Sequence, residues 1–483
     1  MRFSACCCRT LFTACACLAF VGCVNPGQLY DNFATGDELA RLPEDWSGEF
    51  IAASVTTSWI SELGSDELST LAQQALQNNF LLRSQAELVG QRYAQADAAS
   101  GGRLPNLDAA FNLKRSAANT QLSPGEYVYL NAFDASLRLS WNPDLWGQLA
   151  ADARAAAYQL EAAIASYQYQ RSRQIANLAN NWVALVTCNQ RVALNDERIE
   201  RAEELLNAAN QGYALGLEPL LSVRNQELVL AGELRAQLKQ QQQCRQLERT
   251  IALGIGAATG TRIETPQILP PLAATPAAGL PANLLTHRGD LIESRAKLKA
   301  AYEGIAGARA ARFPSLVLSA NVGRNSDNLG TLFSDNINTF SIAAGLAIPL
   351  YAFGRLEAQE QAQRSVAAQA EIAYVEAVYN AITEVENLLD AEAILVQSIQ
   401  LAERGYELAS DSAEIAEQQY AAGTSDFSSW VSAEITRFSN LSTILSLTME
   451  QWQTRIKLYL ALGSSPLSHD EYDSSAYAQP ARS

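Results

Sequence analysis

The chain has 483 residues, of which 48% are hydrophobic, and its formal net charge is −16 at pH 7. Nucleic-acid binding needs basic patches, so this acidic excess argues against a nucleic-acid partner. The chain has only two histidines, and it contains no phosphate-binding loop, no nucleophile elbow and no CxxC pair. We therefore expect neither an enzyme nor a metal or cofactor site.

The N-terminus has the layout of a secretory signal. Basic residues precede an apolar run from Thr10 to Val21, and the small residue Gly22 comes just before Cys23. The run is too short for a comfortable membrane span, and no later segment has the roughly 18 uninterrupted apolar residues of a membrane-spanning helix. We expect residues 1–22 to be a cleaved signal peptide.

The phrase FVGC at the end of this signal, Phe20 to Cys23, resembles the bacterial lipobox. In that motif the cysteine thiol is acylated and the cysteine becomes the first residue of the mature protein. The resemblance implies that Cys23 carries a lipid anchor, palmitate included, with residues 23–64 forming the anchor and an N-terminal equatorial segment. Ordinary cleavage after Ala16, without lipidation, is the alternative.

The first regular elements follow. Helical periodicity over residues 65–100 leads into an Arg-x-Pro phrase at Arg103, after which apolar and polar residues begin to alternate as in a strand. After a polar loop, a second strand is predicted over 133–141. A long helical stretch, residues 148–213, then runs to a turn at Gly216, and a shorter helix returns from it.

The same order of elements comes back in the second half. A helical run over 284–311 ends in an Arg-x-Pro phrase at Arg312, and a strand, a polar loop and a second strand over 340–348 follow. A long helix is predicted over 355–421, with a turn at Gly423 and a returning helix. The sequence therefore predicts a mainly α protein with four strands.

The offsets between the copies indicate a tandem duplication of about 210 residues. Arg312 follows Arg103 by 209 residues (312 − 103), and Gly423 follows Gly216 by 207 (423 − 216). We expect a first repeat over 65–258, an equatorial linker over 259–283, a second repeat over 284–465 and a polar C-terminal tail over 466–483.

The long helices are too long for a compact domain. Each holds roughly 66 residues, or about 100 Å of helix at 1.5 Å per residue. The two shorter helices of each copy together come to about the same length, so stacking them end to end would match one long helix. We expect a coiled-coil cylinder with the proline-rich linker as a belt around it.

The alternation of the second strand of each copy predicts a membrane face. Strict alternation over about ten residues, with longer polar loops, is typical of outer-membrane barrel strands. We expect these side chains to face lipid: Phe133, Leu137, Leu139, Phe340, Ile342 and Leu346. A half-buried strand of a soluble sheet alternates in the same way. The secretory signal and the long helices favour the membrane.

Four strands do not close a barrel, and lipid tolerates no open sheet edge. The chain is therefore expected to oligomerise, with eight strands in a dimer or twelve in a trimer. The residues alone do not choose between the two.

At this point the residues resemble the TolC-like outer-membrane efflux channels, in particular the lipid-anchored branch that serves drug-efflux pumps. The matching phrases cover nearly the whole mature chain: LSTLAQQALQNNFLL at 68–82, RLPNLD at 103–108, the block at 279–316, IPLYAFG at 348–354 and LYLALG at 458–463. The family usually reads Arg-Pro-Asp where this chain has Arg288-Gly289-Asp290, and that departure falls at a helix start.

The resemblance implies a homotrimer with a twelve-stranded barrel in the outer membrane and a coiled-coil tunnel through the periplasm. Such a channel conducts drugs or other small molecules passively, because an inner-membrane pump supplies the energy through a periplasmic adaptor protein. The tips at Gly216 and Gly423 are then the expected adaptor contacts and gate, with Asp426 close by. Outer-membrane lipid is the other expected partner.

Two alternatives stay open. The first keeps the fold but makes the protein the exit duct of a protein-secretion system. The second is a lipid-anchored periplasmic coiled-coil scaffold without a pore, which the long Ala-, Gln- and Glu-rich helices would suit but the four alternating strands would not.

Two cysteines would remain in the mature chain besides Cys23. Cys188 and Cys244 each lie 28 residues from Gly216 (216 − 188 and 244 − 216), so antiparallel helices would bring them to the same height. The periplasm is oxidising, so a disulfide would form if their Cα atoms come within about 7 Å. Two separate buried thiols are the alternative.

Overall fold

The computed structural model describes residues 46, 58–119, 127–276, 279, 281–334 and 338–466. The predicted signal peptide, Cys23 and the tail beyond residue 466 lie outside the described residues. Among the described residues, no helix combines the length and the apolar composition that crossing a membrane requires.

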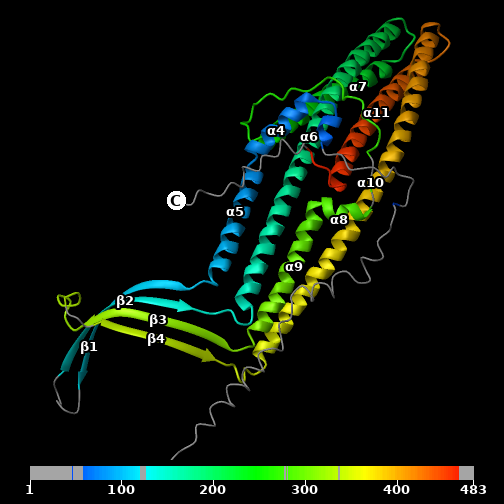
Figure 1. The fold of residues 1–483 in the computed structure, drawn as a ribbon. Coiled ribbons are helices and arrows are strands. Elements are labelled where there is room, and N and C mark those ends of the chain that lie inside the picture. The colour runs from blue at the N-terminus through cyan, green and yellow to red at the C-terminus, as the bar shows by residue number, and fades with distance from the viewer. Residues whose placement is uncertain are drawn as a thin grey trace, which may run out of the picture. The chain divides into compact units, whose positions relative to one another are not determined.

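The elements of the first copy follow the predicted order (Figure 1). They are α3 (Trp59–Glu62), α4 (Asp66–Asn78), α5 (Phe80–Gly101), β1 (Asn106–Asn119), β2 (Tyr127–Trp141), α6 (Gln148–Ala214) and α7 (Leu220–Gly254). The second copy repeats them as η3 (Pro281–Asn283), α8 (Leu284–His287), α9 (Gly289–Ala310), β3 (Ser315–Ser326), β4 (Asn338–Ala347), α10 (Arg355–Ala421) and α11 (Phe427–Ala461). The prediction of a mainly α chain with four strands is confirmed.

The first helix of each copy is broken where the sequence predicts one continuous helix. Asn79 has extended backbone between α4 and α5, and its side-chain Nδ2 donates to the carbonyl of Gly254 at 2.8 Å while Oδ1 accepts from the backbone N–H of Leu82. Arg288 is extended between α8 and α9, and its Nη1 donates to the carbonyl of Ala461. The break in each copy is therefore held by the end of that copy's returning helix.

Close backbone approach explains a glycine at each of these contacts. Gly256 has a φ of +71°, and a Cβ there would lie 2.5 Å from the carbonyl oxygen of Asn78. Gly463 has a φ of +73°, and a Cβ there would lie 2.9 Å from the carbonyl carbon of His287. Any larger residue would push the two segments apart in addition to straining the turn.

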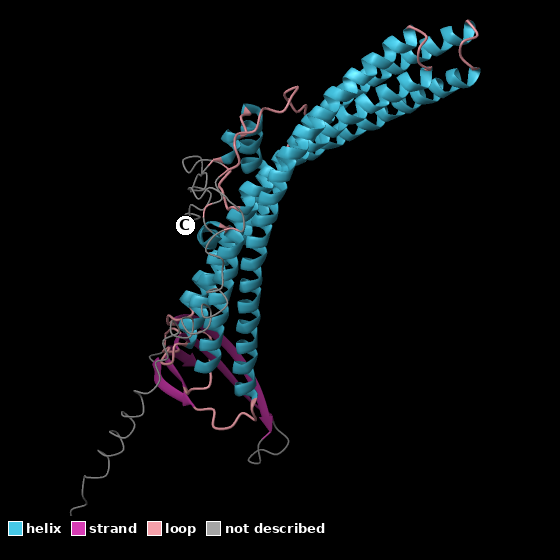
Figure 2. Ribbon diagram, turned by 90° about the vertical axis from the view of Figure 1, so that its right-hand side faces the viewer, coloured by secondary structure: helices cyan, strands magenta, loops and turns pink. Residues whose placement is uncertain are grey.

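The chain forms two compact units. One contains the described residues of 89–163 and 293–375, with the sheet and the helix segments next to it. The other contains those of 42–88, 164–292 and 376–466, with both helical hairpins. In the first unit the sheet is antiparallel in the order β1-β2-β3-β4, and short connections lead from β2 into α6 and from β4 into α10 (Figure 2).

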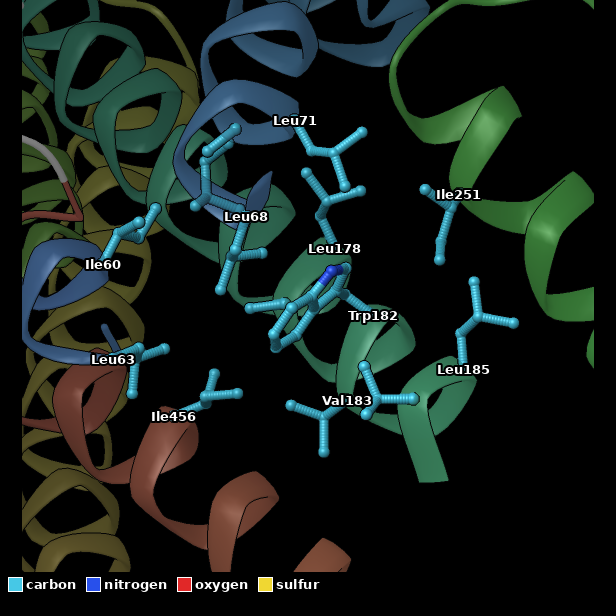
Figure 3. Packing of buried hydrophobic residues seen from close by; sticks show 14 of the residues in the cluster. Ile60, Leu63, Leu68, Leu71, Leu178, Trp182, Val183, Leu185, Ile251 and Ile456 are labelled. Carbon is cyan, nitrogen blue, oxygen red and sulfur yellow. The ribbon is translucent and has the colours of Figure 1, made fainter. Parts of the chain in front are cut away.

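The core of the second unit gathers around α6. Trp182 is fully buried, and its ring centroid lies 6.4 Å from that of Trp452 on α11. Leucine and isoleucine side chains from α3, α4 and α7 surround it, among them Leu68 and Ile251 (Figure 3). A second aromatic pair, Trp59 stacked on Tyr459, joins α3 to the end of α11. This core fixes both hairpins to the short helices α3 and α4.

Candidate functional site

One face of the sheet is apolar across all four strands. Directly opposite residues of an antiparallel pair point to the same face, so the register defines each face. Two rows of opposed residues run across the sheet: Leu107, Leu139, Ala320 and Ile342, and beside them Ala109, Leu137, Val322 and Phe340. The apolar surface therefore continues from β1 to β4.

The residues predicted to face lipid lie on this apolar face: Phe133, Leu137, Leu139, Phe340, Ile342 and Leu346. Phe340 and Ile342 are 81% and 82% exposed, and Leu137 is 47% exposed. Contiguous apolar surface of this kind marks a membrane or protein contact.

The opposite face of the sheet is polar. Asn112 and Asp134 lie opposite each other and are hydrogen-bonded at 3.2 Å, and Ser136 donates to the same carboxylate at 3.1 Å. Gly323 lies opposite Ser136, and a Cβ there would come within 2.8 Å of the Ser136 Cβ. Ser136 is thereby closely packed, whereas Ser341 of β4 on the same face is exposed.

Tryptophans tie the sheet to the two Arg-x-Pro phrases. Trp141 at the end of β2 donates from Nε1 to the carbonyl of Arg103 at 3.1 Å. Trp146 donates to the carbonyl of Pro314 at 2.6 Å, and its ring stacks on Phe313 with centroids 5.0 Å apart. Each phrase accepts one indole N–H, and both tryptophans come from the first copy, so the second phrase is held across the two copies.

The arginine of the second phrase holds the start of α10. Arg312 donates to Glu360 at 2.7 Å and to Glu357 at 3.0 Å. The guanidinium groups of Arg312 and Arg364 lower the pKa of Glu360 to about 2. Sequence reasoning found the repeated arginine but not this role, because Glu360 lies 48 residues further along the chain, in the helix that follows the two strands β3 and β4.

The two hairpin tips are built alike. Gly216 has a φ of +73°, and the N–H of Leu217 donates to the carbonyl of Gly212 at 2.8 Å. Gly423 has a φ of +70°, and the N–H of Thr424 donates to the carbonyl of Gln419 at 2.9 Å. These are Schellman-type helix ends, which need a left-handed residue.

Asp426 caps the N-terminus of α11. Its Oδ1 accepts from the hydroxyl of Ser428 at 2.8 Å and from the backbone N–H of Ser429 at 2.7 Å. These hydrogen bonds lower the pKa of Asp426, because they stabilise the ionised carboxylate. Asp426 therefore has a structural role at the second tip, as the N-cap of α11.

The tips lie side by side at one end of the second unit (Figures 1 and 2). A Cβ on Gly212 would lie 3.4 Å from the hydroxyl of Tyr420, so the tips are in contact. Behind them is a small apolar cluster of Leu205, Ala209, Val223, Phe427 and Trp430, on which the Tyr420 ring stacks.

A charged cluster joins the two hairpins just behind the tips. Arg201 of α6 donates to Glu434 of α11 and to Glu417 of α10, and Glu434 is only 2% exposed. Burial alone would lower the pKa of Arg201, but the hydrogen bonds to these carboxylates raise it above its ordinary value. Sequence reasoning missed this cluster, since its members come from three separate helices.

The cysteine pair lies further along the first hairpin. The structure joins Cys188 of α6 and Cys244 of α7 by a disulfide, with Cα atoms 5.7 Å apart and side chains 4% and 8% exposed. Counting 28 residues from Gly216 along each helix thus leads to neighbouring positions.

The predicted site residues fall into two groups, one in each unit. The six lipid-facing candidates share the sheet, while the tip glycines, Asp426 and the cysteines belong to the hairpins. In the part of the chain that the structure describes, no group of three or more His, Cys, Asp or Glu side chains could hold a metal ion.

A model of the outer membrane efflux protein family matches residues 71–257 and 280–464 of this chain. A pyoverdine export outer membrane protein of Pseudomonas aeruginosa, OpmQ, is 26% identical over 467 residues, which cover 94% of this chain and 96% of that protein. A probable outer membrane lipoprotein of Salmonella typhimurium, SilC, is 26% identical, with 85% of this chain and 88% of that protein covered.

Solved structures have the same fold. The outer membrane channel CmeC of Campylobacter jejuni superposes with a TM-score of 0.81 at 20% identity, covering 86% of this chain and 90% of that one. The outer-membrane channel OprN superposes with a TM-score of 0.80 at 21% identity, covering 89% and 96%.

Proposed function

The chain belongs to the outer membrane efflux protein family, and on that premise we propose that it conducts drugs or other small molecules passively from the periplasm to the exterior. It is the outer-membrane component of an efflux pump, the role that relatives over most of its length carry in their names. It is not an enzyme. What is proposed beyond that role is the direction of transport, its passive mechanism and the class of substrate.

The observation that carries this proposal is the two-sided sheet. Its apolar face spans four strands and its opposite face is polar, which is the arrangement of a barrel wall between lipid and water. Among the described strands, β1 and β4 each have a partner on one side only. Three copies joined at these edges would form a closed barrel of twelve strands, so we propose a homotrimer.

The remaining partners follow from the same premise. The hairpin tips at Gly216 and Gly423 would contact a periplasmic adaptor and form the gate, and an inner-membrane pump would supply the energy. Cys23 would carry the lipid anchor, an inference supported by the lipobox-like phrase and by the lipoprotein name of SilC. The repeats would span residues 65–258 and 284–465, around the equatorial linker 259–283.

Conductance in a planar lipid bilayer tests the proposal. Purified protein should produce discrete steps of ion current, because a closed barrel with a polar interior is a water-filled path. The control is the same detergent without protein. Trimers that insert but pass no current would contradict the channel and support the scaffold alternative.

A further inference from the structure

A cavity of about 410 Å³ lies between α6, α7 and α11 in the second unit. α6 is the neighbour of both other helices (Figure 1), because the Cys188–Cys244 disulfide joins it to α7 and the Trp182–Trp452 pair joins it to α11. A cavity of this size is large enough to hold a small organic molecule.

Two donors at the cavity have no hydrogen-bond partner among the described residues. The hydroxyl of Thr187 is buried, with the residue only 1% exposed, and Nε of Arg191 is buried as well. Arg191 is held at this position by α11, because its Nη2 donates to the hydroxyl of Ser446 at 2.8 Å. A buried donor without an acceptor is costly, so the two orphaned donors point to an acceptor that a ligand would bring.

The positive charge of Arg191 has no counterion at the cavity. Arg191 is the one charged side chain among the described residues that line it, and no carboxylate lines it. A guanidinium stays protonated at any physiological pH, and a partly buried charge without a counterion is unfavourable. In a chain with a net charge of −16, an unpaired cation at a cavity is a specific feature.

The next heptad of the same hairpin contains the carboxylate that is missing here. Arg198 follows Arg191 by seven residues (198 − 191), and its Nη2 donates to Glu233 of α7 at 2.7 Å. Residues seven apart lie on the same helix face, and α6 and α7 are antiparallel. The α7 position that corresponds to Glu233 is therefore Gln240 (240 − 233), whose amide donates to Sγ of Cys188 at 3.1 Å.

The rest of the cavity offers an apolar and rigid wall. Ala184, Leu247 and Met449 line it, one from each of the three helices. Cys188 lines it too, and its disulfide holds α6 and α7 together with Cα atoms 5.7 Å apart. A wall that is already fixed does not have to be ordered when a ligand binds.

The lining discriminates between classes of occupant. Water would satisfy the orphaned donors but would leave the positive charge without a counterion. An inorganic anion would supply the charge but would leave the apolar wall uncovered. A carboxylate that carries an apolar group does both, because its oxygens accept strong hydrogen bonds from a guanidinium and a hydroxyl.

We propose that this cavity binds a small organic carboxylate. The carboxylate accepts hydrogen bonds from Nε of Arg191 and from the hydroxyl of Thr187, and the apolar group of the ligand packs against Leu247 and Met449. The site is complete within one copy of the chain. The inference therefore goes beyond the proposed channel and does not depend on it, and its test measures no current.

Titration of benzoate into the purified full-length protein, followed by saturation-transfer NMR, tests the site. Benzoate should bind about tenfold more tightly than benzamide, its neutral analogue, because hydrogen bonds between charged groups are the stronger ones. Arg191→Gln should weaken benzoate binding about tenfold. Arg262→Gln, which removes an exposed arginine of the linker, is the control and should leave the affinity unchanged. Equal binding of benzoate and benzamide, or full binding by Arg191→Gln, would overturn the proposal.

Gln240→Glu tests the site without removing its arginine. The variant repeats the arrangement of Arg198 and Glu233, so it should fold, and its new carboxylate should compete for Arg191 and weaken benzoate binding about tenfold. Gln242→Glu, on an exposed part of α7 outside the cavity, is the matched control and should bind benzoate as the wild type does. Unchanged binding by Gln240→Glu would contradict the site. Sulfate that displaces benzoate at equal concentration would overturn the organic ligand in favour of an inorganic anion.

Discussion

Individual side chains on the sheet set what each face can contact. Leu137 and Ile342 are exposed on the apolar face, and Ser341 lies between Phe340 and Ile342 but points to the polar face. Ser136 shares the polar face but is packed against Gly323, so it does not tolerate bulk. Position on a face and available space are therefore separate properties, and the alternation of residues predicts only the first.

Arginine substitutions distinguish the faces. Leu137→Arg or Ile342→Arg should cost about 2–4 kcal/mol if the position lies near the bilayer midplane, because a charge would enter lipid. Ser341→Arg is the matched control and should assemble normally. Heat stability of the trimer on gels measures both. Loss of trimer in Ser341→Arg alone would place the lipid on the other face.

Cys23 is predicted to carry the anchor. Mass spectrometry of the mature protein should find an acylated N-terminal cysteine, because signal cleavage before that residue frees its amine and leaves its thiol modified. Cys23→Ser should abolish the added mass. An unmodified N-terminus at Cys17 would contradict the prediction.

The cysteine pair of the first hairpin is predicted to be oxidised after export. Denatured, unreduced protein should show no free thiol at Cys188 or Cys244, and reduction should release two per chain. Closing a loop across the 56-residue separation should stabilise the protein by about 4 kcal/mol, since the unfolded chain loses entropy. Two free thiols per chain before reduction would contradict the predicted disulfide.

At the scale of elements, sequence periodicity predicted where the long helices and strands run, because those patterns are local. The breaks at Asn79 and Arg288 were not predicted: the flanking segments are regular, and the partners, Gly254 and Ala461, are far away in the sequence. The same limit applied to the site. The alternating strands and tip glycines were visible, but the cluster of Arg201 and the indole hydrogen bonds depend on contacts between distant segments.

A buried ion pair fixes three elements together. Arg455 of α11 and Glu392 of α10 are 3% and 1% exposed, and Arg455 also donates to the carbonyls of Ala273 and Ala274 in the linker. Removing one partner leaves the other charge buried without its counterion.

Glu392→Leu should therefore destabilise the protein by about 3–5 kcal/mol. The double variant Glu392→Leu with Arg455→Met should lose less than the single one, because no unpaired charge remains. Denaturant unfolding in detergent gives both values. Equal losses in the two variants would contradict the idea that the unpaired charge of Arg455 is what destabilises the single variant.

On the scale of the whole molecule, negative charge should influence what passes through the channel. The formal net charge of −16 belongs to a chain whose sheet has a polar face and whose α10 is strongly acidic. A pore lined by an excess of acid favours cations.

The measurement is the reversal potential of the conductance in a potassium chloride gradient. It should shift toward the potassium equilibrium potential, and the shift should shrink at high salt as the charges are screened. A shift toward the chloride potential would contradict cation preference.

The matching contacts at Gly256 and Gly463 have an evolutionary consequence. In each repeat the broken first helix contacts the end of the same repeat's returning helix. Neither repeat therefore depends on the other for this contact. A chain of half the length could therefore have made this contact by itself. In place of the proposed trimer, six identical subunits would then have formed the assembly. Fusion lets the two halves diverge, and the cysteine pair of the first hairpin has no counterpart in the sequence of the second hairpin.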